Sequence, residues 1–180
     1  YAAFNWFHHS APEIGIDPEK IAVGGDSAGG ALAAAVCLMA RDRKAPKISF
    51  QMLIYPVTDA RQITDSIKEF VDTPLWNARQ NQKMWQLYLG DQVHRDKAYA
   101  SPMEATSFDN LPPAYVEVAE FDCLRDEGIL FTEALQQSRV AVELNQTRGT
   151  IHGFEIAETS EIVKGSLIRR VEALKRAFGD

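Results

Sequence analysis

The chain lacks the features that mark several large classes of protein. It has 19 Lys and Arg against 25 Asp and Glu, and no basic cluster offers the surface that nucleic acids bind. No apolar run approaches the roughly 20 residues that a membrane-spanning helix needs. Only two cysteines are present, Cys37 and Cys123, too few for a disulfide framework. These absences argue against nucleic-acid binding and a membrane span, and they fit a reducing compartment such as the cytoplasm.

Motifs for phosphates, dinucleotides and metal ions are missing as well. Neither G-x-G-x-x-G nor G-x-x-x-x-G-K-[ST] occurs, and no His, Cys, Asp or Glu residues follow metal-ligand spacing. We therefore expect no metal and no organic cofactor. Internal repeats, low-complexity tracts and Gly- or Ser-rich linkers are also absent, so residues 1–180 are expected to belong to a single domain.

What the sequence does contain is an alternation of strand and helix patterns. Apolar runs predict strands over 20–25, 48–56, 113–120 and 140–149, and helical patterns cover 27–42 and 124–138. In a last helix, one buried stripe is expected from Val163, Leu167, Val171, Leu174 and Phe178. This order predicts an α/β fold with a mostly parallel sheet flanked by helices. An irregular insertion at about 57–102, with a helix over 77–90, interrupts it.

A serine stands between the first predicted strand and its helix. Residues 25–29 are Gly-Asp-Ser-Ala-Gly, the G-x-S-x-G pattern of a sharp turn that lifts the serine hydroxyl above a sheet. We expect Gly25 and Gly29 to remove side chains that would collide there. Ser27 is therefore predicted to be a nucleophile, and the N–H of Ala28 is placed to bind a developing oxyanion. The alternative is a glycine-rich turn that only packs a helix against a strand.

A serine nucleophile needs a base to accept its proton. Of the four histidines, His8 and His9 lie in the opening helix and His94 lies in the insertion. Only His152 follows a predicted strand, where ligands of parallel sheets bind. His152 is therefore the predicted base.

The base in turn needs an acid that orients it. Asp122 directly follows the strand at 113–120 and is the predicted orienter. Asp126 is the alternative, but an acid in the first turn of a helix is also explained by the helix dipole. The resulting chain order of Ser27, Asp122 and His152 is the order found in α/β-hydrolases.

Four segments together resemble the hormone-sensitive-lipase-like esterases, a branch of the α/β-hydrolase superfamily. They are GDSAGG at 25–30, YPVTD at 55–59, LPPAYVEVAEFDCLRDEG at 111–128 and IHGF at 151–154. The resemblance covers essentially the whole chain and implies an α/β-hydrolase fold with a triad of Ser27, Asp122 and His152. The family usually has Pro where this chain has Cys123, a swap that we expect to be tolerated.

The same resemblance indicates that part of the family pattern is absent. Members carry an upstream HGGG segment that completes the oxyanion hole, together with further strands and a cap, and these 180 residues contain none of them. The chain also opens inside an amphipathic helix, with Tyr1, Phe4 and Phe7 at helical spacing. We therefore expect the carboxyl-terminal portion of a longer esterase.

The predicted reaction is hydrolysis of a small acyl ester through an acyl-enzyme, and the resemblance implies short acyl chains. Trp76 and Trp85 of the insertion are candidates for lining the acyl pocket, although core packing would explain them as well. An amidase or deacetylase would use the same triad. A catalytically impaired, hydrolase-like binding module is the alternative of a different class. Whether the protein forms a homo-oligomer stays open.

Overall fold

A parallel sheet forms the centre of the molecule. The computed structural model describes residues 1–90 and 97–179. Within them the sheet consists of β1 (Ala22–Asp26), β2 (Phe50–Ile54), β3 (Ala114–Ala119) and β4 (Val142–Thr147), in that spatial order. Every neighbouring pair runs parallel. The α/β architecture expected from the sequence is thus confirmed.

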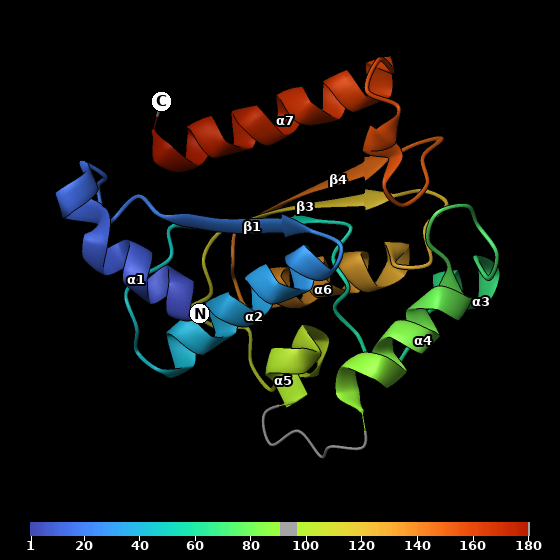
Figure 1. The fold of residues 1–180 in the computed structure, drawn as a ribbon, viewed down its shortest axis with the longest axis horizontal. Coiled ribbons are helices and arrows are strands. Elements are labelled where there is room, and N and C mark those ends of the chain that lie inside the picture. Colours follow the sequence, from blue (N-terminus) through green and yellow to red (C-terminus); the bar gives the residue numbers. More distant parts are fainter. Residues whose placement is uncertain (91–96, 180) are drawn as a thin grey trace.

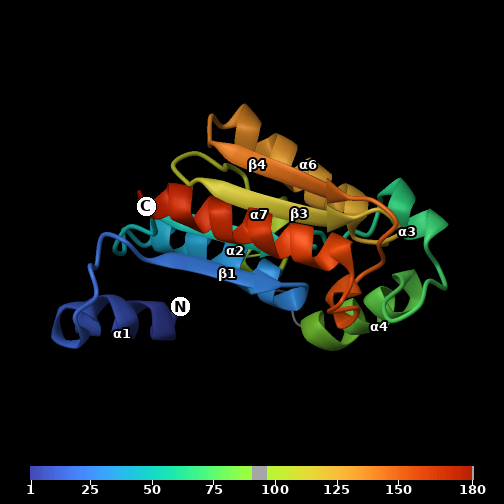
Figure 2. The same ribbon diagram turned by 90° about the horizontal axis from the view of Figure 1, so that it is seen from above.

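Helices cover both faces of the sheet. Helices α2 (Ala28–Asp42) and α6 (Arg125–Gln137) lie on one face, and α7 (Glu161–Phe178) crosses the other (Figures 1 and 2). On the first face a buried cluster includes Leu38, Leu53, Val116 and Phe131. Helix α1 (Ala2–Ser10) and the 3₁₀ turn Ala11–Ile14 precede β1, and Phe4 joins that same cluster. A second buried cluster, which includes Tyr115 of β3 and Val163 of α7, lies on the other face, so the two faces have separate cores.

The insertion starts beyond the carboxyl ends of the strands, and its last helix packs against α2. It contains α3 (Asp65–Glu69), α4 (Ala78–Leu89), α5 (Lys97–Ala100) and the 3₁₀ turn Pro102–Glu104. Helix α4 matches the helix predicted over 77–90. The Asn77 side chain accepts a hydrogen bond from the N–H of Gln80, which caps the start of α4. A third apolar cluster, with Val57, Trp85 and Leu124, joins the insertion to the start of α6.

Helix α7 buries only part of the stripe expected from its sequence. Val163 is buried and Leu174 is partly buried against the sheet, but Leu167 is 47% and Val171 is 51% exposed. The buried residues of the helix are instead Val163, Ser166 and Ala173. The prediction was wrong for Leu167 and Val171 because the sheet face beneath α7 is not wholly apolar: it carries Glu117 of β3, which the Ser166 hydroxyl contacts. Polar residues of α7 must therefore face the sheet. Among the described residues, no helix has both the length and the apolar character to cross a membrane.

Candidate active site

Ser27 occupies a strained turn between β1 and α2. Its φ of 57° and ψ of −120° lie outside the regions that side-chain-bearing residues usually adopt. A Cβ on Gly25 would come within 2.4 Å of the Gly29 carbonyl carbon, so glycine is required there. The expectation for Gly29 was wrong, because its own Cβ would meet open space. Gly30 is the second constrained position, where a Cβ would lie 2.8 Å from Pro56 Cβ.

The structure brings the predicted base and acid to this serine. His152 Nε2 lies 2.9 Å from Ser27 Oγ, and His152 Nδ1 lies 2.7 Å from Asp122 Oδ2. Asp122 is fully buried and His152 is 8% exposed, while Ser27 is only half-buried. A carboxylate in this environment favours the imidazole tautomer that carries its proton on Nδ1. The Nε2 lone pair then faces the hydroxyl, as proton transfer from a serine requires.

The loops after β3 and β4 hold each other in place and thereby fix the acid and the base. The Phe121 N–H donates to the Thr150 carbonyl at 2.8 Å, and the Glu120 N–H donates to the Thr147 carbonyl. Asp122 Oδ1 accepts the Leu124 N–H at 3.0 Å, which leaves Oδ2 for His152. Each of the three candidate side chains follows a strand, as expected for ligand sites of parallel sheets.

The alternative candidates lie elsewhere. Asp126 accepts the Ser66 N–H at 2.7 Å and pairs with Arg125, so it ties α3 to α6. His8 and His9 belong to α1, before the first strand. His94 lies outside the described residues.

The N–H of Ala28 lies at the first residue of α2, where no acceptor within the helix is available. A small apolar cavity of about 90 Å³ opens beside Ala28, with Val57, Met84 and Trp85 among the residues that line it. Trp85 is only 3% exposed and belongs to the third apolar cluster, so it both packs the core and forms part of this wall. Trp76, the other candidate for the acyl pocket, does not line this cavity; its ring centroid lies 6.0 Å from that of His152.

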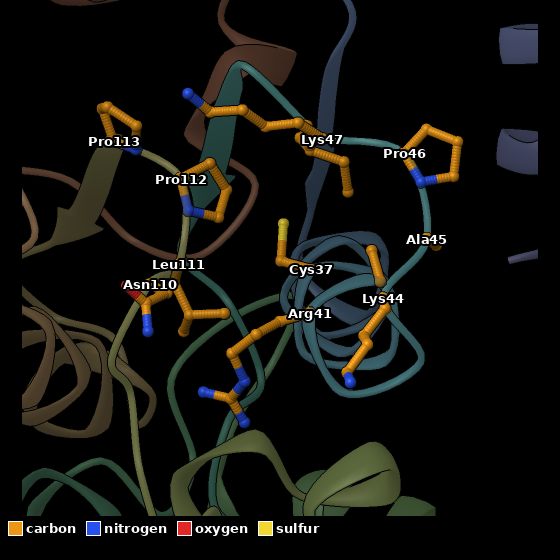
Figure 3. A pocket seen from close by; sticks show the side chains of 12 residues that line it. Cys37, Arg41, Lys44, Ala45, Pro46, Lys47, Asn110, Leu111, Pro112 and Pro113 are labelled. Carbon is orange, nitrogen blue, oxygen red and sulfur yellow. The ribbon is translucent and has the colours of Figure 1, made fainter.

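A larger cavity lies near the amino ends of β2 and β3, on the side of the sheet away from the predicted triad. It has a volume of about 470 Å³ and lies between the end of α2 and the segment that leads into β3 (Figure 3). Arg41, Lys44 and Lys47 give it basic side chains, but Arg41 already donates to the Ser107 carbonyl at 2.7 Å. No member of the predicted triad lines it. Among the predicted site residues, Ala28 and Trp85 line the smaller cavity, and the triad side chains line neither of the two.

Burial controls the other reactive groups near the triad. Burial, reinforced by the charge of Asp122, raises the pKa of the Cys123 thiol, so this cysteine stays protonated. Burial also raises the pKa of Glu127 well above its ordinary value, although the N–H groups of Thr58 and Asp59 oppose the shift. A cysteine nucleophile is thereby disfavoured next to the triad.

Sequence reasoning missed Tyr55, the residue in closest ring contact with His152. The two ring centroids are 4.5 Å apart, and Tyr55 is 4% exposed. A signal was present, because Tyr55 begins the YPVTD segment and directly follows a strand, the position that also identified Asp122. Sequence reasoning likewise missed Glu155, which accepts the Tyr55 hydroxyl at 2.7 Å.

Comparison with known proteins agrees with the α/β fold described above. A family model described as the alpha/beta hydrolase fold matches residues 1–156. The chain belongs to this family. Among curated relatives of this α/β-hydrolase, Esterase LipI of Mycobacterium tuberculosis is 37% identical over 155 residues, covering 86% of this chain and 48% of LipI. Carboxylesterase NlhH of the same organism is 34% identical over 182 residues, covering 99% of this chain and 57% of NlhH.

Solved structures give the same result. A bacterial heroin esterase superposes with a TM-score of 0.95 at 42% identity, covering 99% of this α/β-hydrolase and 58% of that chain. A thermostable esterase from Pseudomonas putida gives a TM-score of 0.93 at 37% identity, covering 99% and 57%. The chain thus spans about half the length of the relatives it matches. Its resemblance to the hormone-sensitive-lipase-like esterases is confirmed.

Proposed function

We propose that this chain carries the catalytic triad of a serine carboxylesterase that hydrolyses small, short-chain acyl esters, within one α/β-hydrolase domain. The observation that carries the proposal is the continuous hydrogen-bonded line from Ser27 Oγ through His152 to the buried Asp122. Similarity to carboxylic ester hydrolases over nearly the whole chain supports the same reaction class. Because those relatives are about twice as long, the activity is proposed for the whole protein.

In the acylation step, Ser27 Oγ attacks the ester carbonyl carbon and His152 Nε2 takes the hydroxyl proton. The carbonyl oxygen becomes an oxyanion, which accepts a hydrogen bond from the N–H of Ala28 at the positive end of α2. His152 then gives its proton to the departing alkoxide, and the acyl group stays on Ser27. Asp122 stabilises the imidazolium that exists between these transfers.

In the deacylation step, the same groups act on water. His152 accepts a proton from a water molecule, whose oxygen attacks the acyl carbon and forms a second oxyanion. Collapse of that intermediate releases the carboxylic acid and returns the proton to Ser27 Oγ. The small volume of the apolar cavity beside Ala28 supports a short acyl group.

A panel of p-nitrophenyl esters of increasing acyl length, with matched anilides, tests the proposal. We expect turnover to be highest on acetate to butyrate, to fall with longer chains, and to be lowest on the anilides. Ser27→Ala should reduce kcat by roughly a millionfold, toward the uncatalysed rate. Preferential cleavage of the anilides would make the protein an amidase, and binding of esters without any turnover would make it a binding module.

A further inference from the structure

A line of polar side chains connects the sheet to the loop that carries His152. We call Glu117, Arg170, Glu155 and Tyr55 the Arg170 network. The Arg170 guanidinium on α7 donates to Glu117 of β3 and to Glu155, which lies in the 3₁₀ turn Phe154–Ile156. Glu155 also accepts the Tyr55 hydroxyl at 2.7 Å. The mechanism proposed above uses none of these four side chains directly.

Tyr55 ends this line against the catalytic imidazole. It is held at both ends, because its backbone N–H donates to the Glu117 carbonyl at 2.6 Å and its hydroxyl donates to Glu155. Its ring lies against His152, with the planes at 53°. The backbone φ of +33° is unfavourable for a residue with a side chain. Such strain persists only where the surrounding structure imposes it, and it is concentrated at functional sites.

Stability alone does not explain the network. Glu117 is fully buried on a strand whose neighbours on the same face, Tyr115 and Ala119, belong to an apolar cluster. Replacement of a buried ion pair by apolar residues of similar volume is often neutral or stabilising. A network that apolar residues could replace without loss of stability, and that reaches the predicted base, is better explained by what it holds in place.

We propose that Tyr55 is a positioning residue, whose ring, anchored through its hydroxyl to Glu155 and Arg170, keeps the His152 imidazole aligned between Ser27 and Asp122. The inference rests on the proposed function and adds a requirement to it. His152 takes and returns a proton twice in each cycle, and each transfer needs the ring in one orientation. Without its anchor the Tyr55 ring can shift, and the imidazole can tilt away from Ser27 Oγ.

Tyr55→Phe tests this, with Tyr115→Phe as the matched control. Each change removes a buried phenolic hydroxyl that donates a hydrogen bond to a glutamate. Tyr55 donates to Glu155, and Tyr115 donates to Glu117 at 2.7 Å. Of the two tyrosines, only Tyr55 lies in ring contact with His152. Glu117 keeps Asn145, Ser166 and Arg170 as donors when the Tyr115 hydroxyl is lost, so Arg170 stays in place.

One readout is the rate of Ser27 phosphorylation by paraoxon, measured on the longest natural chain that contains these residues. The other is the low-field proton resonance of His152 Nδ1–H, which does not depend on turnover. We expect Tyr55→Phe to slow labelling about tenfold, within the hundredfold range that misplacement of reacting groups can cause. The same variant should broaden or shift the imidazole resonance, while Tyr115→Phe leaves both readouts at parental values.

Equal behaviour of the two variants in both readouts would overturn the inference. Glu155→Gln supplies a second test, because Gln still accepts the Tyr55 hydroxyl but loses the charge that pairs with Arg170. It should give an intermediate labelling rate, and a rate below that of Tyr55→Phe would also contradict the inference. A parent chain that paraoxon does not label would refute the proposed function, while the imidazole resonance would still decide the role of Tyr55.

Discussion

Two of the glutamates that the structure describes are fully buried, and they occupy opposite electrostatic environments. Glu117 lies under α7 and accepts hydrogen bonds from Tyr115, Asn145, Ser166 and Arg170. Glu127 lies in the first turn of α6. Its Oε1 accepts the backbone N–H of Thr58 at 2.6 Å, and its Oε2 has no partner among the described residues.

The difference in partners reverses the effect on the pKa. Burial raises the pKa of both carboxyl groups. For Glu117 the hydrogen bonds from Arg170, Ser166 and Tyr115 outweigh burial and lower the pKa. For Glu127 two backbone N–H groups do not outweigh it, and the pKa rises. Burial therefore does not decide the charge of a carboxyl group; a nearby cation and several donors do.

Removing the cation that pairs with Glu117 should have the largest effect on stability. Arg170→Met leaves Glu117 buried without its counter-charge, so we expect a loss of about 3–5 kcal/mol in the free energy of unfolding at neutral pH. Chemical denaturation monitored by circular dichroism would measure it. The matched control is Arg176→Met on the same helix, whose pair with Glu143 is about half exposed at both ends. The control should cost less than about 1 kcal/mol, and equal losses would contradict the account.

Neutralising Glu127 should raise the free energy of unfolding, which is the opposite of the effect expected for Arg170→Met. Because the folded-state pKa of Glu127 is raised, its protonated form is favoured in the folded protein. The stability that Glu127 contributes is therefore fully present below its unfolded-state pKa and is lost as the pH rises through its folded-state pKa. Glu127→Gln cannot ionise and should therefore be more stable than the parent at pH 8. The gain should grow above pH 5 by about 1.4 kcal/mol for each pH unit, until the folded-state pKa is passed.

Denaturation curves of Glu127→Gln between pH 5 and pH 8 would measure this gain. Glu133→Gln is the control, since Glu133 lies on the same helix but is exposed. Its effect should be close to zero and independent of pH. A stabilisation by Glu127→Gln that shrinks with rising pH would show that Glu127 is ionised without cost.

Removing one neutral donor from Glu117 should have the smallest effect. Ser166→Ala deletes a hydroxyl that lies 2.6 Å from the carboxylate, and we expect a loss of about 1.5 kcal/mol at neutral pH. The lowered pKa of Glu117 means that its contribution is present above the unfolded-state pKa and lost as pH falls. The cost of Ser166→Ala should therefore shrink in acid. A cost independent of pH would indicate lost packing instead of a lost bond to a carboxylate.

The sequence was sufficient for the order of the main strands and helices, and it pointed to three side chains that the structure brings together. Ser27, Asp122 and His152 each follow a strand, and parallel strands bring their carboxyl ends to one edge whatever the intervening chain does. The local sequence pattern placed each residue after a strand, and the parallel topology brought those strand ends together. The contacts among the three residues follow from these two facts.

The Arg170 network was not predictable in the same way. Glu117 lies in the run Val-Glu-Val, which is equally consistent with an exposed polar position, so its burial depended on the placement of α7. The stripe of α7 was misassigned for the same reason, because Ser166 and Arg170 face the sheet to satisfy that carboxylate. Gly29 was misjudged because the collision in the turn comes from Gly25 against the backbone of Gly29.

The central claim is that Ser27 is activated by His152 and Asp122. The most direct test is peptide mapping by mass spectrometry after treatment with a fluorophosphonate, on the parent and on His152→Ala. The account predicts a single stoichiometric phosphonyl group on the peptide that contains Ser27, with labelling slowed by orders of magnitude in the histidine variant. Modification of another residue, or unchanged labelling of Ser27 without the imidazole, would contradict it.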